Sequence, residues 1–194
     1  KRMNNKKRGM LVLYTGSSGV GKGTIMQELL KRDKNIRLSV SNTTRSPRKG
    51  EIDGVHYNFV TKEQFESLIK KDGYLEYAQY CGNYYGTPKQ QVEDLLNQGY
   101  DVFLEIEVCG GLQIMEKYPD VLSIFVLPPS IDTLEKRLRK RNTENEETIL
   151  ERLGQAKREI SFKDKYKYAV VNDKLEDAVD EIINIIKTAK SETK

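Results

Sequence analysis

The segment Met10–Glu28, MLVLYTGSSGVGKGTIMQE, decides the fold of this 194-residue chain. A short apolar run breaks at Gly16 into a glycine-rich turn, and after Lys22 the apolar residues return with helical spacing. Gly16, Gly21 and Lys22 fit the G-x-x-x-x-G-K spacing, in which successive backbone N–H groups converge on phosphate oxygens. The segment therefore predicts a strand, a phosphate-binding loop and a helix.

The predicted loop has the chemistry of a nucleoside triphosphate site. Its glycines leave the backbone bare, and the following helix adds its positive N-terminal dipole. The ammonium of Lys22 can then reach the β- and γ-phosphates. A tight connection with no ligand is the alternative, and the lysine with its flanking strand and helix argues against it. The predicted ATP-binding residues of the loop are Gly16, Ser17, Ser18, Gly19, Val20, Gly21, Lys22, Gly23 and Thr24.

The position after Lys22 bears on the metal. The usual hydroxyl that ligates Mg²⁺ is replaced by Gly23, and a hydroxyl follows one residue later at Thr24. This GKGT form resembles nucleoside monophosphate kinases, in which water and phosphate oxygens can hold most of the metal shell. We therefore expect Mg²⁺ to accompany ATP and predict no certain protein ligand for it.

Composition excludes several other classes. The net charge of +4 is too modest to demand nucleic-acid binding, and the basic residues within 1–8 are read as a solvated tail. Cys81 and Cys109 have neither disulfide-framework nor zinc spacing, and His56, the sole histidine, is expected at the surface. The longest apolar runs are strand-length. We expect a cytoplasmic protein without nucleic-acid or membrane partners.

Apolar periodicity along the chain predicts an α/β protein with a buried parallel sheet. Thr61 with Gln64 forms a capping-box pattern, and Thr87 followed by Pro88 reads as the N-cap and first position of a helix that Gly99 closes. Asp173 is the expected N-cap of the last helix. Strands are expected near 36–41, 55–60, 74–80, 102–108, 121–127 and 168–171, and helices near 23–34, 61–72, 87–98, 130–141, 146–160 and 173–189.

Two insertions are expected to interrupt this core. Residues 39–85 and 130–157 stand where a second-substrate lobe and a lid would follow a phosphate loop. The core would then comprise 9–38, 86–129 and 158–194, after the tail at 1–8.

Residues 43–60, TTRSPRKGEIDGVHYNFV, resemble the signature segment of guanylate kinases over eighteen positions. The likeness extends along the chain through SVS at 39–41, YLEY at 74–77, GNYYGT at 82–87, LEIE at 104–107 and VND at 171–173. The resemblance implies a three-layer α/β/α P-loop core with an inserted GMP-binding lobe and a helical lid. It also implies ATP-dependent phosphorylation of GMP, and of dGMP, by direct in-line transfer with Mg²⁺.

The first insertion contains groups suited to a mononucleotide phosphate. Arg45 and Arg48 can each present paired N–H donors to phosphate oxygens, and the phenols of Tyr57 and Tyr85 add neutral donors. A solvated turn with incidental arginines is the alternative on spacing alone.

For the base, a carboxylate can accept the N1–H and N2–H₂ donors of guanine, whereas the ring acceptor of adenine would repel it. By resemblance, Glu76 takes this role, Ser41 and Thr87 supply hydroxyls, and Glu107 lies nearby. Many family members carry aspartates where this chain has Glu105 and Glu107. For Glu105 a metal role and a sheet-end carboxylate paired with a nearby cation are both open.

The second insertion is rich in arginine. Arg137 and Arg141 are four residues apart and share a helical face, and Arg152 follows on the next predicted helix. Spacing alone would favour a solvated basic helix. The resemblance instead implies that these three arginines neutralise the triphosphate during transfer, beside Lys22 and Arg45, and that Asn172 contacts the adenine of ATP.

Two other functions are alternatives to this interpretation. Guanylate-kinase-like domains of scaffolding proteins bind phosphopeptides without useful catalysis, but the intact loop from Gly16 to Lys22 argues against that use here. A kinase for another nucleotide is the second rival, and Glu76 with the signature segment argues against it. The expected partners are ATP and GMP, for a chain that acts as a monomer or homodimer.

Overall fold

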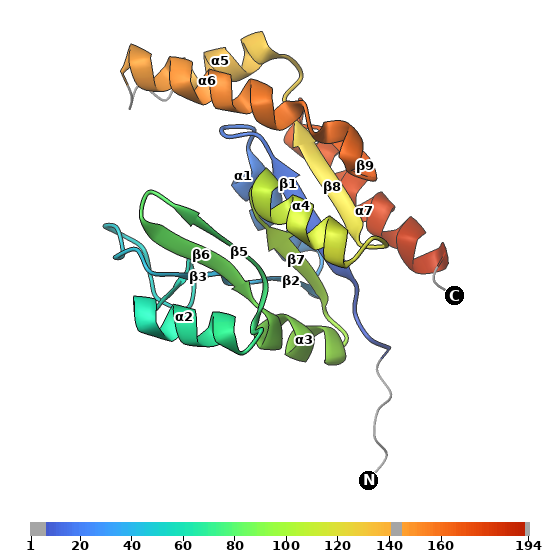
Figure 1. The fold of residues 1–194 in the computed structure, drawn as a ribbon. Coiled ribbons are helices and arrows are strands. Elements are labelled where there is room, and N and C mark those ends of the chain that lie inside the picture. Colours follow the sequence, from blue (N-terminus) through green and yellow to red (C-terminus); the bar gives the residue numbers. More distant parts are fainter. Residues whose placement is uncertain (1–6, 141–144, 193–194) are drawn as a thin grey trace. The chain divides into compact units, whose positions relative to one another are not determined.

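The computed structural model describes residues 7–140 and 145–192, which form two compact units. The first contains residues 7–12 and 35–121, and the second contains 13–34, 122–140 and 145–192. Strand β1 (Leu11–Gly16) contributes residues to both units. It is the middle strand of a five-stranded sheet with the order β2-β7-β1-β8-β9 (Figure 1). The predicted α/β class with a parallel sheet is confirmed.

The first unit contains strands β2 and β7 of that sheet and a smaller second sheet. Strand β2 (Ile36–Leu38) pairs in parallel with β7 (Asp101–Glu105), and Ile36 lies opposite Asp101. The smaller sheet has the order β4-β3-β6-β5. Its strands are β3 (Asn42–Thr43), β4 (Asn58–Phe59), β5 (Tyr74–Tyr80) and β6 (Asn83–Pro88), and the helices of this unit are α2 (Lys62–Lys70), α3 (Lys89–Asn97) and α4 (Val108–Lys117).

An aromatic cluster forms the core beneath the smaller sheet. Phe65 of α2 is fully buried and stacks between Tyr74 of β5, at 4.3 Å between ring centroids, and Tyr84 of β6, at 4.9 Å. The capping box predicted at Thr61 is confirmed: its side chain accepts from Gln64 N, and the Gln64 side chain accepts from Thr61 N. The cap fixes where α2 begins and therefore where Phe65 enters the core.

The second unit carries the glycine-rich loop and the remaining helices. Strands β8 (Leu122–Leu127) and β9 (Tyr168–Val171) pair in parallel, with Ile124 opposite Tyr168. Helix α1 (Lys22–Arg32) packs against α7 (Leu175–Glu192). Helices α5 (Ile131–Lys140) and α6 (Glu146–Ile160) pack together through Leu134, Leu138, Ile149, Leu153 and Ala156, and a short 3₁₀ helix covers Lys163–Lys165.

Three predicted strands are shorter in the structure. The strand expected at 36–41 ends at Leu38, and beyond it Val40 N donates to the side chain of Gln91 at 3.1 Å and not to a neighbouring strand. The strand expected at 55–60 is reduced to Asn58–Phe59, because the chain turns at Gly54, where φ is +76° and the N–H donates to Tyr57 O. The strand expected at 102–108 ends at Glu105, and the chain enters α4 at Val108 with Glu107 as the N-cap.

Two helix starts were predicted wrongly. Pro88, not Thr87, is the N-cap of α3, because Thr87 belongs to β6 and pairs with Glu76 of β5. Strand β6 was missed; it follows a tight turn at Cys81 and Gly82, where φ is +48° and +77°. Helix α7 begins at Leu175, one residue later than an Asp173 N-cap requires, and its first hydrogen bond runs from Ala178 N to Lys174 O.

Two surface predictions have different outcomes. His56 is exposed, as expected, and its Nδ1 accepts from Ile52 N. Arg8, which we read as part of a solvated tail, is instead anchored to α3. Its guanidinium donates to Asn97 Oδ1 at 2.7 Å and to Glu93 Oε1 at 3.0 Å.

Candidate active site

The glycine-rich loop lies between β1 and α1 in the second unit. Gly19 and Gly21 have φ of +77° and +95°, in the left-handed region that favours glycine. A Cβ at Gly21 would lie 2.6 Å from Asn172 Nδ2, and a Cβ at Gly19 would lie 2.8 Å from Leu138 Cδ2. Both conformation and space therefore require glycine at these two positions.

Lys22, the first residue of α1, folds its side chain back over the loop. Its Nζ donates to Gly16 O at 2.5 Å and to Ser17 O at 3.2 Å. The first residue of the helix is held by strand β1, because the buried Tyr14 hydroxyl donates to Lys22 O at 3.1 Å. A positive charge is thus held at the loop beside the N-terminus of α1, as an anion site requires.

Asn172, at the end of β9, anchors the loop from the other side. It is 8% exposed, and its Nδ2 donates to Val20 O at 2.8 Å. Its backbone oxygen accepts from Arg137 Nη2 at 2.9 Å, which ties α5 to the same place. The amide group is therefore bound to the loop, and the contact of Asn172 with adenine stays a prediction.

Glu159 is a loop contact that sequence reasoning missed. Its Oε2 accepts from Ser18 N at 3.1 Å, and its Oε1 accepts from Gln155 Nε2 at 3.0 Å. Arg152, Gln155 and Glu159 are spaced i, i+3 and i+7, so they share one face of α6. The signal available in the sequence was this spacing from Arg152, an arginine already assigned to the triphosphate.

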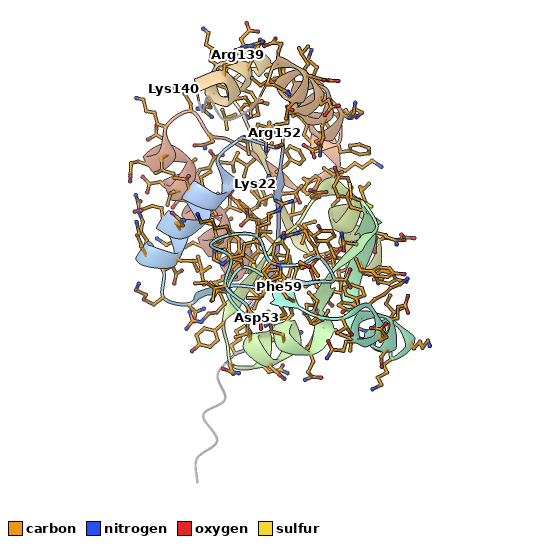
Figure 2. All side chains as sticks on the ribbon, turned by 90° about the vertical axis from the view of Figure 1, so that its left-hand side faces the viewer. Lys22, Asp53, Phe59, Arg139, Lys140 and Arg152 are labelled. Atoms are coloured by element: carbon orange, nitrogen blue, oxygen red, sulfur yellow. The ribbon has the colours of Figure 1, made fainter. Side chains whose placement is uncertain are left out.

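The arginines of the second predicted insertion differ in their surroundings. Arg152 is half-buried on α6, and Figure 2 shows it between Lys22 and the far end of the helical pair, where Arg139 and Lys140 lie. Arg139 is paired with Glu135 at 2.8 Å and with Glu146. Arg141 lies outside the described residues.

In the first unit, Arg45 is held by a carboxylate that we did not predict as a site residue. Its Nη1 and Nη2 donate to Glu51 Oε2 and Oε1, both at 2.9 Å. Glu51 Oε2 also accepts from Arg48 N at 2.7 Å. The Arg45 guanidinium, followed by this backbone N–H, lowers the pKa of Glu51 to about 2. The opposite charge six residues from Arg45 was the available sequence signal.

The bidentate pair leaves one edge of the Arg45 guanidinium for another anion. Nε of Arg45 is buried and has no hydrogen-bond partner among the described residues. The ring centroid of Tyr57 lies 5.5 Å from the guanidinium carbon, and the Tyr57 and Tyr85 ring centroids are 6.0 Å apart. Desolvation raises the pKa of Tyr57, so its hydroxyl stays a donor at neutral pH. The structure thus brings together three of the four groups predicted for a phosphate.

Glu76 lies on β5 and is 5% exposed. Thr87 Oγ1, on the neighbouring β6, donates to Glu76 Oε1 at 2.6 Å, which leaves Oε2 as a second acceptor. Burial raises the pKa of Glu76, and the Thr87 hydrogen bonds and the charge of Lys117 oppose that rise. A buried carboxylate beside a hydroxyl can accept donors from a planar base.

The other residues predicted to bind GMP in this unit, Ser41, Arg48 and Glu107, are more exposed than Glu76. Ser41 is half-buried and immediately precedes β3, where its backbone oxygen accepts from Asn58 N at 2.9 Å. Arg48 is exposed, two residues before the turn at Gly50. Glu107 is exposed at the N-cap of α4. Figure 2 labels Asp53 and Phe59 of the adjoining turn, where Asp53 Oδ1 accepts from Phe59 N at 2.9 Å.

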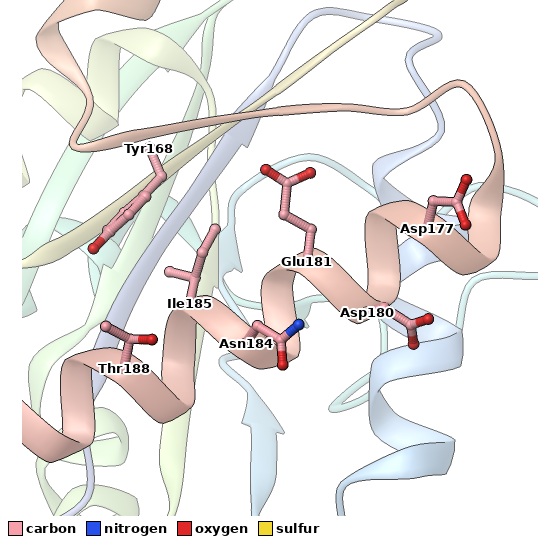
Figure 3. Close-up of a pocket in the computed structure, with 7 residues that line it drawn as sticks. All are labelled: Tyr168, Asp177, Asp180, Glu181, Asn184, Ile185 and Thr188. Carbon is pink, nitrogen blue, oxygen red and sulfur yellow. The ribbon is translucent and has the colours of Figure 1, made fainter.

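A pocket of about 450 Å³ opens on the surface of the second unit, and none of the predicted site residues lines it (Figure 3). Three carboxylates line it, Asp177, Asp180 and Glu181, and Asp180 also pairs with Arg32 at 2.8 Å. This charge would repel a triphosphate. The pocket is therefore not a candidate for the nucleotide.

Within residues 7–140 and 145–192, no three or more His, Cys, Asp or Glu side chains are placed to hold a metal ion together. None of the helices in these ranges has the length and apolar character of a membrane span.

Comparison with known proteins places this geometry in context. A family model described as guanylate kinase matches residues 7–189. The guanylate kinase of Oceanobacillus iheyensis is 51% identical over 183 residues, which cover 94% of this chain and 89% of that protein. The guanylate kinase of Clostridium tetani is 50% identical, with 95% and 88% covered.

Solved structures give the same result for the fold. The crystal structure of guanylate kinase from Anaplasma phagocytophilum aligns with a TM-score of 0.74 at 35% identity, covering 94% of this chain and 87% of that one. A shikimate kinase from Bacteroides thetaiotaomicron aligns with a TM-score of 0.50 at 14% identity, over 92% and 98% of the two chains. This second likeness concerns the fold alone.

Proposed function

The chain belongs to the guanylate kinase family, and on that premise we propose that it transfers the γ-phosphoryl group of ATP to GMP and also to dGMP. The observation that carries the proposal is the Glu76 carboxylate, 5% exposed and hydrogen-bonded to Thr87 at 2.6 Å. Such a carboxylate accepts the N1–H and N2–H₂ of guanine and repels the ring acceptor of adenine.

The roles of the remaining acceptor residues follow from their chemistry. We assign Arg45, Arg48, Tyr57 and Tyr85 to the GMP phosphate, and Ser41 and Glu107 to the base end of the same nucleotide. The unpartnered Nε of Arg45 supports this assignment, because a buried N–H donor is costly unless it meets an acceptor. Residues 39–85 are proposed as the GMP-binding lobe.

The second unit supplies the donor half. We assign the backbone of residues 16–24 and the Lys22 ammonium to the ATP phosphates, Arg137, Arg141 and Arg152 to charge that develops during transfer, and Asn172 to the adenine side. Residues 130–157 are proposed as the lid, and 9–38, 86–129 and 158–194 as the core. The GMP phosphate oxygen attacks the γ-phosphorus in line, so no protein nucleophile is needed.

Mg²⁺ is proposed to enter with ATP. Gly23 follows Lys22, Thr24 is exposed one residue further on, and the acidic cluster that a protein-built cage requires was not found among the described residues. These residues fit a metal held mainly by phosphate oxygens and water, and when bound the metal would offset the charge of the phosphates. We propose a cytoplasmic monomer or homodimer, without nucleic-acid or membrane partners.

A coupled assay of ADP release tests the function. The chain is supplied with Mg²⁺ and ATP, and GMP, dGMP, AMP, CMP and UMP are compared as acceptors. We expect turnover with GMP and dGMP alone. Glu76→Gln should lose about 100-fold in kcat/KM for GMP, because the amide presents an N–H₂ to the guanine donors. Folded protein that turns over none of the five would instead favour a phosphopeptide-binding domain.

A further inference from the structure

Helix α4 presents a stripe of three residues to strand β5, which carries Glu76. Gly110, Gln113 and Lys117 are spaced i, i+3 and i+7 and therefore share one helical face. Each of them contacts Glu76 or one of the two residues that flank it in β5. Figure 1 shows α4 and β5, which pack against each other in the first unit.

Gln113 hydrogen-bonds to the backbone on the C-terminal side of Glu76. Its Nε2 donates to Tyr77 O at 3.0 Å, and its Oε1 accepts from Tyr77 N at 3.3 Å. The side-chain amide thus makes the pair of hydrogen bonds that a neighbouring strand would make. It fixes the strand immediately after Glu76.

Lys117 hydrogen-bonds to the backbone on the N-terminal side of Glu76. Strand β5 is irregular here: Tyr74 pairs with Pro88 and Glu76 with Thr87, so Leu75 is an additional residue with no opposite partner in β6. The carbonyl oxygen of Leu75 accepts from Lys117 Nζ at 2.8 Å. A bulge of this kind redirects the side chain that follows it, and Lys117 satisfies the carbonyl that the bulge releases.

Gly110 makes room for the carboxylate itself. A Cβ at this position would lie 2.6 Å from Glu76 Oε2 and 3.0 Å from its Cδ. The same Oε2 is the acceptor that Thr87 leaves available. A side chain at residue 110 would therefore displace the oxygen that the base has to meet.

We propose that Gly110, Gln113 and Lys117 are positioning residues for base selection, which hold the Glu76 carboxylate at the angle that guanine requires. This rests on the proposed function and names residues that set its acceptor specificity. The contacts act on the backbone of residues 75 and 77 and on the space beside Oε2, so they set the direction of the carboxylate without touching the reacting phosphates. Loss of these contacts should consequently weaken the binding of GMP and leave the binding of ATP unchanged.

The test uses Gln113→Ala, Lys117→Met and Gly110→Ala in the full chain, with kcat and KM measured separately for GMP and ATP. We expect KM for GMP to rise about five- to twentyfold in each, while kcat and KM for ATP stay within about twofold, because only binding of the base is impaired. Lys117→Arg should restore KM for GMP, since a guanidinium can still donate to Leu75 O.

A matched control separates positioning from general damage. Glu116→Gln changes an exposed residue of α4 beside Lys117. It should leave both KM values unchanged. Thermal unfolding of every variant is recorded alongside.

The outcomes distinguish the inference from the function on which it rests. An unsubstituted chain that neither binds GMP in calorimetry nor phosphorylates it overturns both. Normal activity of the unsubstituted chain, with unchanged KM for GMP in the three variants, overturns the inference alone. So does a parallel rise of both KM values with a lower melting temperature, because that pattern shows a role in folding only.

Discussion

Arg45 and Glu51 form a bidentate ion pair, with both N–O distances at 2.9 Å and a second acceptor role for Glu51 at Arg48 N. The pair uses the Nη1–Nη2 end of the guanidinium and leaves the buried Nε available. Glu51 is therefore an orienting group for the arginine assigned to the GMP phosphate.

Glu51→Gln should raise KM for GMP about tenfold, with a small change in kcat, because the amide holds only one edge of Arg45 and the guanidinium loses its fixed direction. Steady-state kinetics with varied GMP measures the effect. Glu66→Gln removes the carboxylate of an exposed pair with Lys62 at 3.8 Å and is the control. An unchanged KM for GMP in Glu51→Gln would contradict the orienting role.

The Arg45–Glu51 pair also predicts that the effect of Glu51→Gln on KM for GMP does not depend on pH between 5 and 8. Glu51 has a pKa lowered from 4.5 to about 2 by Arg45 and the Arg48 N–H. Its contribution to stability is thus present above pH 4.5 and is lost as the pH falls towards 2. Between pH 5 and 8 its charge is constant, so the ratio of KM values between Glu51→Gln and the unsubstituted chain should not vary over that range. A ratio that changes with pH would be inconsistent with this pKa.

Glu76 should behave differently, because burial raises its pKa above 4.5. Guanine binds the carboxylate form, so kcat/KM for GMP should fall on acidification earlier than an exposed glutamate would allow. The GMP phosphate also titrates, at a pKa of about 6. The pH profile of kcat/KM for GMP is therefore compared between the unsubstituted chain and Glu76→Gln. In the variant, the change caused by titration of the GMP phosphate should remain, and the change caused by titration of Glu76 should disappear. Superimposable profiles would refute the assignment.

The raised pKa of Glu76 also determines how this residue affects the stability of the fold as the pH changes. A carboxyl whose pKa is higher in the folded state stabilises the fold most at low pH, and that contribution is lost as the pH rises through the folded pKa. Glu76→Gln should accordingly melt no lower than the unsubstituted chain at pH 8. This result would show that the loss of GMP turnover in Glu76→Gln does not come from unfolding of the variant.

Lys22→Met should lower kcat by about 100-fold or more, because the ammonium at the loop supplies charge stabilisation to the transferred phosphoryl group. The variant keeps the aliphatic length and loses the donors to Gly16 O and Ser17 O. Single-turnover kinetics reports the chemical step directly. Lys31→Met on the same helix, where the side chain is 72% exposed, is the matched control.

Glu159→Ala should raise KM for ATP about fivefold, because α6 loses its bond to Ser18 N and the face that carries Arg152 loses its fixed orientation toward the loop. KM for GMP should not change. Glu151→Ala removes an exposed carboxylate from the same helix and tests whether charge alone matters. Equal effects of the two substitutions would argue against the role of Glu159.

Much of this protein is determined by sequence alone. The segment from Met10 to Glu28 specifies its strand, loop and helix locally, because the glycine spacing and the apolar periodicity act over a few residues. The capping box at Thr61 and the start and end of α6 are local for the same reason. Positions 43–60 and the family likeness identify the chemistry.

Tertiary structure decided what depends on partners distant in the chain. Thr87 reads locally as a helix cap, but strand pairing with β5 brings it to Glu76, eleven residues away. Glu159 meets Ser18 across 141 residues. The bulge at Leu75 and the stripe of Gly110, Gln113 and Lys117 have no local signature, because they exist only when α4 packs on β5. Propensity and spacing describe neighbours in the chain, and these contacts join neighbours in space.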